Sequence, residues 1–161
     1  MILPLEQWLE RNLGLKAGDV TRFQQALTHS SYGAENYQRL EFLGDRILAL
    51  VIAEWLCELY PSEDEGDLAK RLAQQVSGEI CAVIAKSLGV SDYVRLGKQA
   101  RDDGGSMSHN ILGDALEALI GATYVDFGLE EAKTLIRRLW LEQMQHNQPV
   151  PQHPKSALQE W

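Results

Sequence analysis

The chain has 161 residues, of which 45% are hydrophobic and 24% charged, and its formal net charge at pH 7 is −8. This length is typical of one domain that buries about 70% of its unfolded surface, so it needs neither disulfides nor metal ions to form a core. The acidic balance argues against a nucleic-acid partner, because proteins that bind polyanions are usually basic.

Apolar residues recur at helical spacing along almost the whole chain, and no clear strand alternation appears, so the expected fold class is all-α. Glycine, proline and N-capping residues mark where the helices begin and end. The expected helical ranges, in chain order, are 5–13, 19–29, 37–60, 65–88 with a candidate break at Gly78, 108–127 and 130–146. A glycine-rich polar loop is expected over 97–109, between the helical range 65–88 and the helix that begins near residue 108.

Targeting and membrane segments are not predicted. The start, MILPLEQWLE, has no basic flank, and the longest purely apolar run, Ile47 to Ala53, is too short to span a bilayer. Cys57 and Cys81 stand in apolar helical stretches without zinc-ligand spacing, which predicts small buried thiols in a reducing compartment. We therefore expect a cytoplasmic protein with no membrane partner.

The tripeptide Leu-Gly-Asp occurs twice, at 43–45 and at 112–114, each time inside a strongly apolar predicted helix. A glycine in the middle of a helix costs about 1 kcal/mol relative to alanine. Two such glycines indicate a structural reason, of which the commonest is the close approach of another backbone.

Each Leu-Gly-Asp segment also belongs to a pair of acids on one helical face. Glu41 and Asp45 are four residues apart, and Asp114 and Glu117 are three apart. A carboxylate on a largely buried helix protonates or finds a cation. The alternative is that each acid pairs with a basic side chain; Arg39 and Arg46 stand close to the first pair, whereas the range 110–127 contains no Lys or Arg.

Two acid pairs beside two glycines favour a metal site over ion pairing. All the candidate ligands are carboxylate oxygens, which selects Mg²⁺, Mn²⁺ or Ca²⁺ over zinc or copper. No His has a Glu three positions before it, so the motif of di-iron helical bundles is absent. A Mg²⁺ site that keeps several waters fits phosphoryl chemistry best.

Residues 36–48, NYQRLEFLGDRIL, resemble the signature of the ribonuclease III family. Three further segments resemble that family in the same order, and the resemblance covers nearly all of residues 1–146: ALTHSSY (26–32), DEGDL (64–68) and ILGDALEALIGATYVDFG (111–128). The resemblance implies an all-α endonuclease domain, a bundle of about seven or more helices, that works as a homodimer. It further implies Mg²⁺-dependent cleavage of double-stranded RNA, with Mn²⁺ as a substitute, that leaves 5′-phosphates and short 3′ overhangs during processing of rRNA precursors and some mRNA and tRNA precursors.

The resemblance also implies roles for particular residues. The metal ligands of the family match Glu41, Asp45, Asp114 and Glu117, of which Asp45 and Glu117 would also orient the attacking water. Secondary metal or substrate contacts are expected from Gln38 and Glu65, although the signature often has Glu where this chain has Gln38. The alternative for Glu65 is a plain acid at a helix N-terminus. Phe42 falls in the segment that the family uses at its dimer interface, with a plain core position as the alternative. Candidate contacts to the RNA backbone are Lys70, Arg71, Lys98 and Arg101, with a solvated surface as the alternative.

The remaining segment, 147–161, is polar and rich in proline, which is typical of a linker. Its last residues, PKSALQEW, resemble the junction at which the family's double-stranded-RNA-binding domain begins. We therefore expect an endonuclease domain over 1–146, followed by a linker and the truncated start of a second domain. Three rival functions are a non-catalytic RNA-binding module on the same fold, a helical carboxylate protein that stores redox metal, and a helical interaction protein.

Overall fold

The computed structural model describes residues 1–145 and 149–151, and the regular secondary structure within them is helical apart from one isolated bridge between Thr28 and Arg95. The helices are α1 (Leu5–Trp8), which continues as a π-helical turn η1 (Leu9–Leu13), α2 (Thr21–Ala26), α3 (Gln38–Leu59), α4 (Glu65–Gln75), α5 (Gly78–Ser87), η2 (Val90–Asp92), α6 (Lys98–Asp102), η3 (Gly105–Met107), α7 (His109–Phe127), α8 (Leu129–Leu139) and α9 (Leu141–Gln145). The predicted all-α class is thus confirmed. None of the helices in the described ranges combines the length and apolar character that a bilayer crossing requires.

Two helical predictions need correction, and one break is confirmed. The loop expected over 97–109 contains the short helix α6 and the turn η3, and the helix expected over 130–146 divides at Trp140 into α8 and α9. The expected break near Gly78 is real, because the Ser77 side chain caps α5 by accepting a hydrogen bond from the amide of Ile80. The linker and second domain expected over 147–161 lie, apart from 149–151, outside the described residues.

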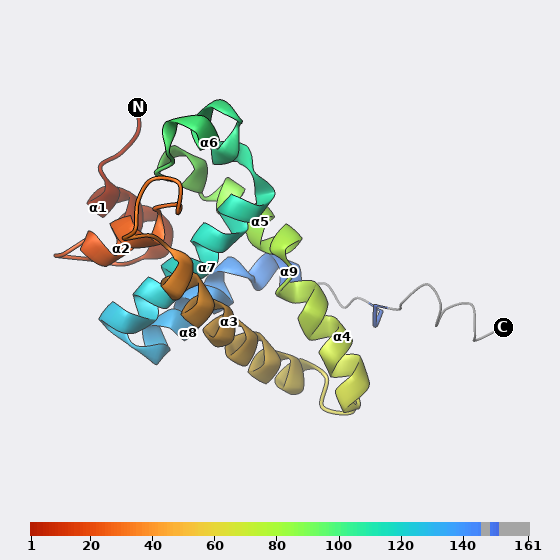
Figure 1. Ribbon diagram of the computed structural model, residues 1–161. Coiled ribbons are helices and arrows are strands. Elements are labelled where there is room, and N and C mark those ends of the chain that lie inside the picture. The colour runs from red at the N-terminus through yellow and green to blue at the C-terminus, as the bar shows by residue number, and fades with distance from the viewer. Residues whose placement is uncertain (146–148, 152–161) are drawn as a thin grey trace.

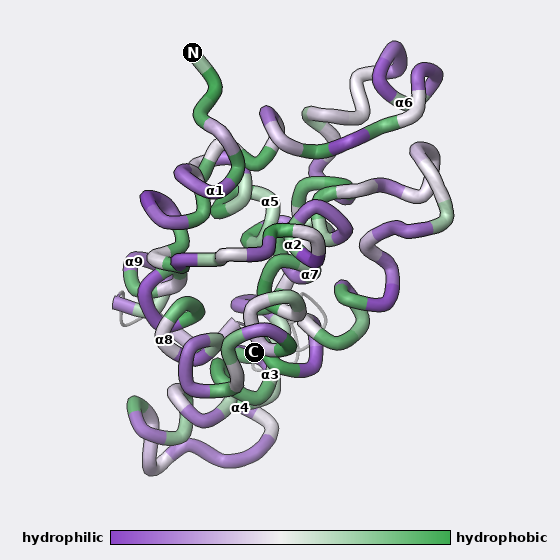
Figure 2. The backbone as a smooth tube through the Cα atoms, turned by 90° about the vertical axis from the view of Figure 1, so that its left-hand side faces the viewer, coloured by the Kyte–Doolittle hydropathy of each residue, from purple (hydrophilic) through white to green (hydrophobic). Residues whose placement is uncertain are grey.

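Helix α7 forms the centre of the molecule, with α2, α3, α5 and α8 packed around it (Figure 1). Its side chains are buried without interruption from Ala115 to Thr123, which explains the near absence of polar residues in that range. Figure 2 shows the complementary pattern, with hydrophilic segments toward the outside, including the loop that carries α6. A helix buried on all sides gives any acid that it carries little access to water.

Helices α3 and α7 touch backbone to backbone at two reciprocal glycines. A Cβ atom on Gly44 would lie 1.7 Å from the carbonyl oxygen of Glu117, and one on Gly121 would lie 2.3 Å from that of Leu40. Close backbone approach, expected for the mid-helix glycines, is therefore the reason for Gly44. Gly113 serves a different neighbour, since a Cβ there would lie 3.2 Å from the carbonyl oxygen of Gly78 at the start of α5.

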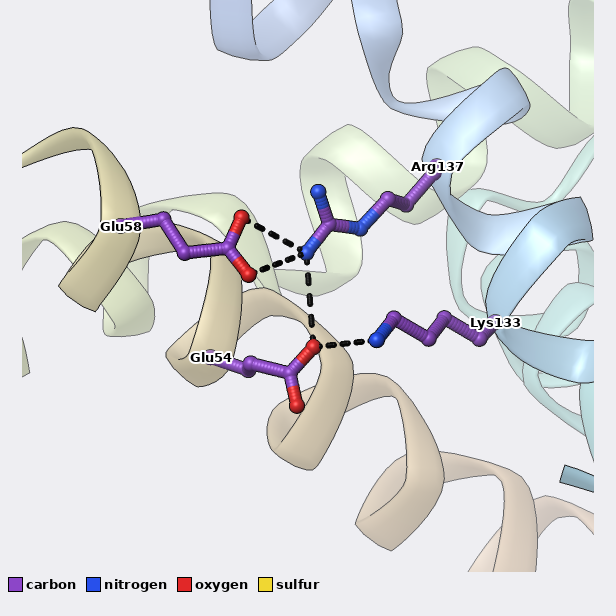
Figure 3. A network of polar contacts seen from close by, with 4 residues as sticks. All are labelled: Glu54, Glu58, Lys133 and Arg137. Carbon is purple, nitrogen blue, oxygen red and sulfur yellow. Dashed lines mark hydrogen bonds and ion pairs between the residues drawn. The ribbon is translucent and has the colours of Figure 1, made fainter. Parts of the chain in front are cut away.

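The carboxyl-terminal half of α3 is tied to α8 by charged side chains (Figure 3). Lys133 Nζ lies 2.5 Å from Glu54 Oε1, and Arg137 Nη2 lies 3.0 Å from Glu58 Oε2 and 3.4 Å from Glu54 Oε1. Exposed pairs of this kind contribute little stability singly. As a network, however, they fix the direction in which α3 runs from its crossing with α7.

A buried arginine joins α4 to the end of α3. Arg71 is 8% exposed, donates to Glu63 Oε1 at 2.7 Å and Oε2 at 2.8 Å, and lies 3.8 Å from the ring centroid of Tyr60. Arg71 is therefore engaged within the fold, so the solvated-surface alternative is wrong for this residue, and its ion pair with Glu63 argues against a contact to RNA. The other three candidates, Lys70, Lys98 and Arg101, are exposed.

Candidate metal centre

The glycine contact between α3 and α7 sets the two acid pairs face to face. Glu41 and Asp45 come from α3, and Asp114 and Glu117 from α7, on either side of the point where Gly44 meets the backbone of Glu117. Side-chain hydrogen bonds join Glu41 to Asp114 and Asp45 to Glu117. The four carboxylates predicted from two separate segments therefore form one cluster, linked across the helix pair.

The acids of this cluster hold protons more tightly than free carboxyls do. Burial, reinforced by the charge of Asp45, raises the pKa of Glu117, which is only 9% exposed, to about 8. Burial and the charge of Asp114 raise the pKa of Glu41 to about 7, and burial also raises the pKa of Asp114. These shifts report chiefly the removal of the carboxyls from water, to which the neighbouring acids add at Glu41 and Glu117.

Basic side chains compensate only one member of the cluster. Arg46 forms an ion pair with Asp45 and stacks over the ring of Phe42, with its guanidinium carbon 4.6 Å from the centroid. Within residues 1–145, no ion pair joins Glu41, Asp114 or Glu117 to a Lys or Arg. Ion pairing, the alternative to a metal site, therefore fails for three of the four acids.

The donor chemistry fits a hard divalent cation, since every candidate ligand is a carboxylate oxygen and the charge is uncompensated. As the side chains lie, no group of three or more Asp, Glu, His or Cys residues in the described ranges is gathered closely enough to hold an ion. The carboxylates instead contact one another in the two cross-helix pairs. Binding a cation would require these hydrogen bonds to open and the oxygens to turn toward a common point.

The cluster opens to solvent through a cleft of about 340 Å³. The lining residues are Gln38, Glu41, Phe42, Asp45, Arg46 and Glu117. The structure thus brings Gln38 to the same opening as three of the acids. It does not bring Glu65 to this cleft within one chain. Glu65 lines a separate groove beside Ala53 and Cys57. Ala53 lies about three helical turns, or roughly 18 Å, along α3 from Glu41.

A tyrosine that the sequence reasoning missed also contacts the cluster. The hydroxyl of Tyr37, a residue 4% exposed, donates to Asp114 Oδ2 at 3.4 Å. Burial, together with the charges of Asp114 and Glu41, raises the pKa of this phenol, so it remains a donor. The signal that could have found it is spacing, because Tyr37 stands four residues before Glu41 and hence on the same side of the chain as the α3 acids.

One face of α3 carries apolar side chains into solvent. Phe42 is 64% exposed and Leu50 57% exposed, so the core alternative for Phe42 is wrong. Cys57 lies exposed on the same helix, which corrects the expectation of two buried thiols, whereas Cys81 is buried and its pKa is raised to about 12. At the far end of this face, α3 and α4 form an almost purely apolar groove of about 340 Å³, lined by Ala53, Leu56, Cys57, Glu65, Leu68, Ala69 and Leu72.

The model of a family described as ribonuclease-III-like matches residues 19–144 of this chain. That range contains both helices that carry the carboxylate cluster. The chain therefore belongs to the ribonuclease III family, as the signature at 36–48 predicts. It is 53% identical over 154 residues to Ribonuclease 3 of Zymomonas mobilis, covering 96% of this chain and 63% of that protein. It is 40% identical over 158 residues to Ribonuclease 3 of Rhodopseudomonas palustris, covering 95% of this chain and 58% of that protein.

Solved structures agree with this assignment. The nuclease domain of ribonuclease III from Campylobacter jejuni superposes with a TM-score of 0.84 at 37% identity, covering 91% of this chain and 100% of that one. Dicer from Pichia stipitis shares the fold. It superposes with a TM-score of 0.63 at 24% identity, covering 99% of this chain and 70% of that one. The chain corresponds to a nuclease domain in its fold, and it spans about three fifths of the length of the curated relatives named above.

Proposed function

We propose that this chain is the endonuclease domain, residues 1–146, of a Mg²⁺-dependent endoribonuclease that hydrolyses phosphodiester bonds in double-stranded RNA. The observation that carries the proposal is the cluster of Glu41, Asp45, Asp114 and Glu117, of which three have no basic partner in the described chain. The names of the Zymomonas and Rhodopseudomonas relatives support the ribonuclease activity. The Campylobacter nuclease domain supports its assignment to this part of the chain.

In the proposed mechanism, Glu41 and Asp114 hold the cation, while Asp45 and Glu117 also hold it and orient the attacking water. When bound, Mg²⁺ supplies positive charge that lowers the pKa of water and stabilises the charge that develops on the phosphate. The water oriented by Asp45 and Glu117 gives up a proton and attacks phosphorus in line, and the bond from phosphorus to the 3′-oxygen breaks, so that this oxygen leaves and takes up a proton as a hydroxyl. This direction of attack yields the 5′-phosphate, and staggered cuts on the two strands yield short 3′ overhangs. Because the ligands are all oxygen atoms, Mn²⁺ is expected to replace Mg²⁺.

The substrate assigned here is recognised by its shape. An RNA duplex offers a wide, shallow minor groove lined by 2′-hydroxyls and phosphates, which a protein without base-reading motifs can select. Gln38 lines the cleft, which supports its assignment as a substrate contact, and Lys70, Lys98 and Arg101 stay candidates for contacts to the RNA backbone. Processing of rRNA precursors and of some mRNA and tRNA precursors, in the cytoplasm, stays a prediction of the sequence.

We also propose that two copies of the chain pair through the exposed face of α3. That face has a protruding Phe42 at its amino-terminal end and the apolar groove beside Cys57 at its other end. In a two-fold symmetric pair, the same two surfaces of each copy meet each other. If the two α3 helices run antiparallel, Phe42 of each copy therefore enters the groove beside Cys57 of the other copy. Glu65 lines that groove, so the same arrangement would carry it toward the carboxylate cluster of the second copy.

The function is tested by cleavage of a perfect RNA duplex in Mg²⁺ and in chelator, with Glu117→Gln alongside. We expect cleavage only with Mg²⁺, and a cleavage rate more than about 100-fold lower in the variant. Loss of a residue that only hydrogen-bonds to a metal ligand typically costs about 10- to 100-fold, and loss of a ligand itself should cost more. Duplex binding and the fold should persist, since the amide replaces a carboxyl that is protonated near neutral pH.

Glu131→Gln, on the exposed side of α8, is the matched control and should cut like the wild type. Cleavage by Glu117→Gln at a near wild-type rate would show that the site is wrongly assigned. Duplex binding without any cleavage by the wild type in Mg²⁺ or Mn²⁺ would instead support the non-catalytic RNA-binding module.

A further inference from the structure

Tyr37 is a neutral polar residue outside the two acid pairs that donates a hydrogen bond to the carboxylate cluster. It stands directly before α3, its ring is buried, and its hydroxyl donates to Asp114 Oδ2 at 3.4 Å. Asp114 lies on α7, a helix without a Lys or Arg, so this phenol supplies the hydrogen bond that a basic residue would otherwise give. A neutral donor orients a carboxylate without neutralising the charge that attracts a cation.

The position of Tyr37 is fixed from two directions. Its backbone amide donates to the carbonyl oxygen of Thr28 at 2.8 Å, which anchors the end of the 28–37 segment. Its ring packs edge-on against His29, with the ring centroids 5.7 Å apart and the planes at 77°. The phenol oxygen therefore has little freedom to leave Asp114.

His29 is in turn held by the chain that precedes α6. Its Nδ1 lies 2.7 Å from Ser31 Oγ, and that oxygen also accepts a hydrogen bond from the amide of Gly97 at 2.9 Å. A Cβ atom on Gly97 would lie 2.4 Å from the carbonyl oxygen of Ser31, so the two backbones are in close contact. A continuous set of contacts thus runs from Gly97 through His29 and Tyr37 to Asp114.

We propose that Tyr37 is a positioning residue that restrains one oxygen of the Asp114 carboxylate and so limits how far this group must turn to bind the divalent cation. The inference rests on the proposed metal site and adds to it a residue outside the four carboxylates. Partners that hydrogen-bond to metal ligands fix the ligand's direction, and their loss weakens metal affinity about 10- to 100-fold. With Tyr37 in place, one oxygen of Asp114 is restrained and the carboxylate keeps its full charge for the cation.

The test is Tyr37→Phe, which keeps the buried ring and its contact with His29 and removes only the hydroxyl. We expect the dissociation constant for Mn²⁺, measured on the protein alone by calorimetry or by the paramagnetic resonance signal of free Mn²⁺, to rise about 10-fold. In cleavage assays the rate at limiting Mn²⁺ should fall and largely recover at saturating Mn²⁺, while KM for the RNA duplex stays unchanged.

Tyr93→Phe is the matched control, because the Tyr93 hydroxyl also donates a hydrogen bond, to the carbonyl oxygen of Leu3 at 2.6 Å, away from the cluster. It should leave the dissociation constant for Mn²⁺ unchanged even if it lowers the melting temperature. An unaltered Mn²⁺ affinity in Tyr37→Phe would overturn the positioning role alone. Failure of the wild type to bind Mn²⁺ would overturn the proposed metal centre, and the role of Tyr37 with it.

Discussion

At the scale of single residues, burial distinguishes the carboxyls of the cluster from ordinary surface acids. Glu117 and Glu41 carry pKa values raised to about 8 and about 7, chiefly because α7 and the crossing remove them from water. Arg46 compensates Asp45 alone. Because their pKa values are raised, Glu41 and Glu117 hold protons near neutral pH, and the proposed divalent cation would have to displace these protons.

Stability in the absence of metal should accordingly depend on pH. The unfolded Glu carboxyl titrates near 4.3, so between about pH 4.3 and 8 the folded state binds more protons than the unfolded one at Glu41 and Glu117. The free energy of unfolding should then fall as pH rises through this window. Added Mn²⁺ should raise the melting temperature more at pH 8 than at pH 6, because metal binding requires the deprotonated acids.

Thermal unfolding in chelator and in Mn²⁺, from pH 5 to pH 8, measures this dependence. The double variant Glu41→Gln, Glu117→Gln serves as the reference, since it keeps every other titrating group and should have a flatter profile. A wild-type melting temperature in chelator that rises with pH relative to this variant would contradict the assigned pKa shifts.

At the scale of elements, the site exists because two long helices approach more closely than side chains allow. Gly44 meets the carbonyl of Glu117, and Gly121 meets that of Leu40. The sequence singled out Gly44 through the repeated Leu-Gly-Asp, but gave no sign that Gly121 is its counterpart or that Gly113 faces α5. Spacing along one helix identifies a face, whereas it carries no information about which other helix lies on that face.

Gly44→Ala should damage the fold and the site together. The added methyl would lie 1.7 Å from the Glu117 carbonyl oxygen, so the helices must separate, and overpacking of this kind costs about 1–3 kcal/mol or more. Denaturant unfolding should show the loss of stability, and Mn²⁺ titration of the folded fraction should show weaker binding, because Glu41 and Asp45 move away from α7.

Gly78→Ala is the control for this experiment, since a Cβ at that helical glycine meets nothing within 4 Å. Alanine favours helices over glycine by up to about 1 kcal/mol, so this variant should be neutral or stabilised. If Gly44→Ala were as stable as Gly78→Ala, the close backbone contact between α3 and α7 would be wrong.

At the scale of the whole molecule, the unusual surface is the apolar face of α3. Phe42 protrudes at one end, and the groove beside Cys57 opens at the other. Exposed apolar patches of this kind mark sites of association.

Phe42→Glu should turn the proposed dimer into a monomer, because a carboxylate cannot enter the apolar groove without losing its hydration. Sedimentation velocity at micromolar concentration distinguishes the two states. Leu129→Glu, at an exposed apolar position on α8, controls for the added charge and should remain a dimer. A wild-type chain that sediments as a monomer, or a Phe42→Glu variant that sediments as a dimer, would contradict the proposed arrangement.

The sequence by itself determined the helical class, most helix boundaries, the family and the four acids, because periodicity, capping residues and motif spacing are all local properties of the chain. Spacing placed the acids as two pairs, and the family resemblance assigned both pairs to one metal site. Only the tertiary structure decided that the pairs face each other across Gly44 and Gly121, that the Tyr37 hydroxyl reaches Asp114 and that Arg71 is buried against Glu63. It also decided that Phe42 and Cys57 lie in solvent, since burial depends on which helix covers a face, and that choice is made by packing between residues far apart in the chain.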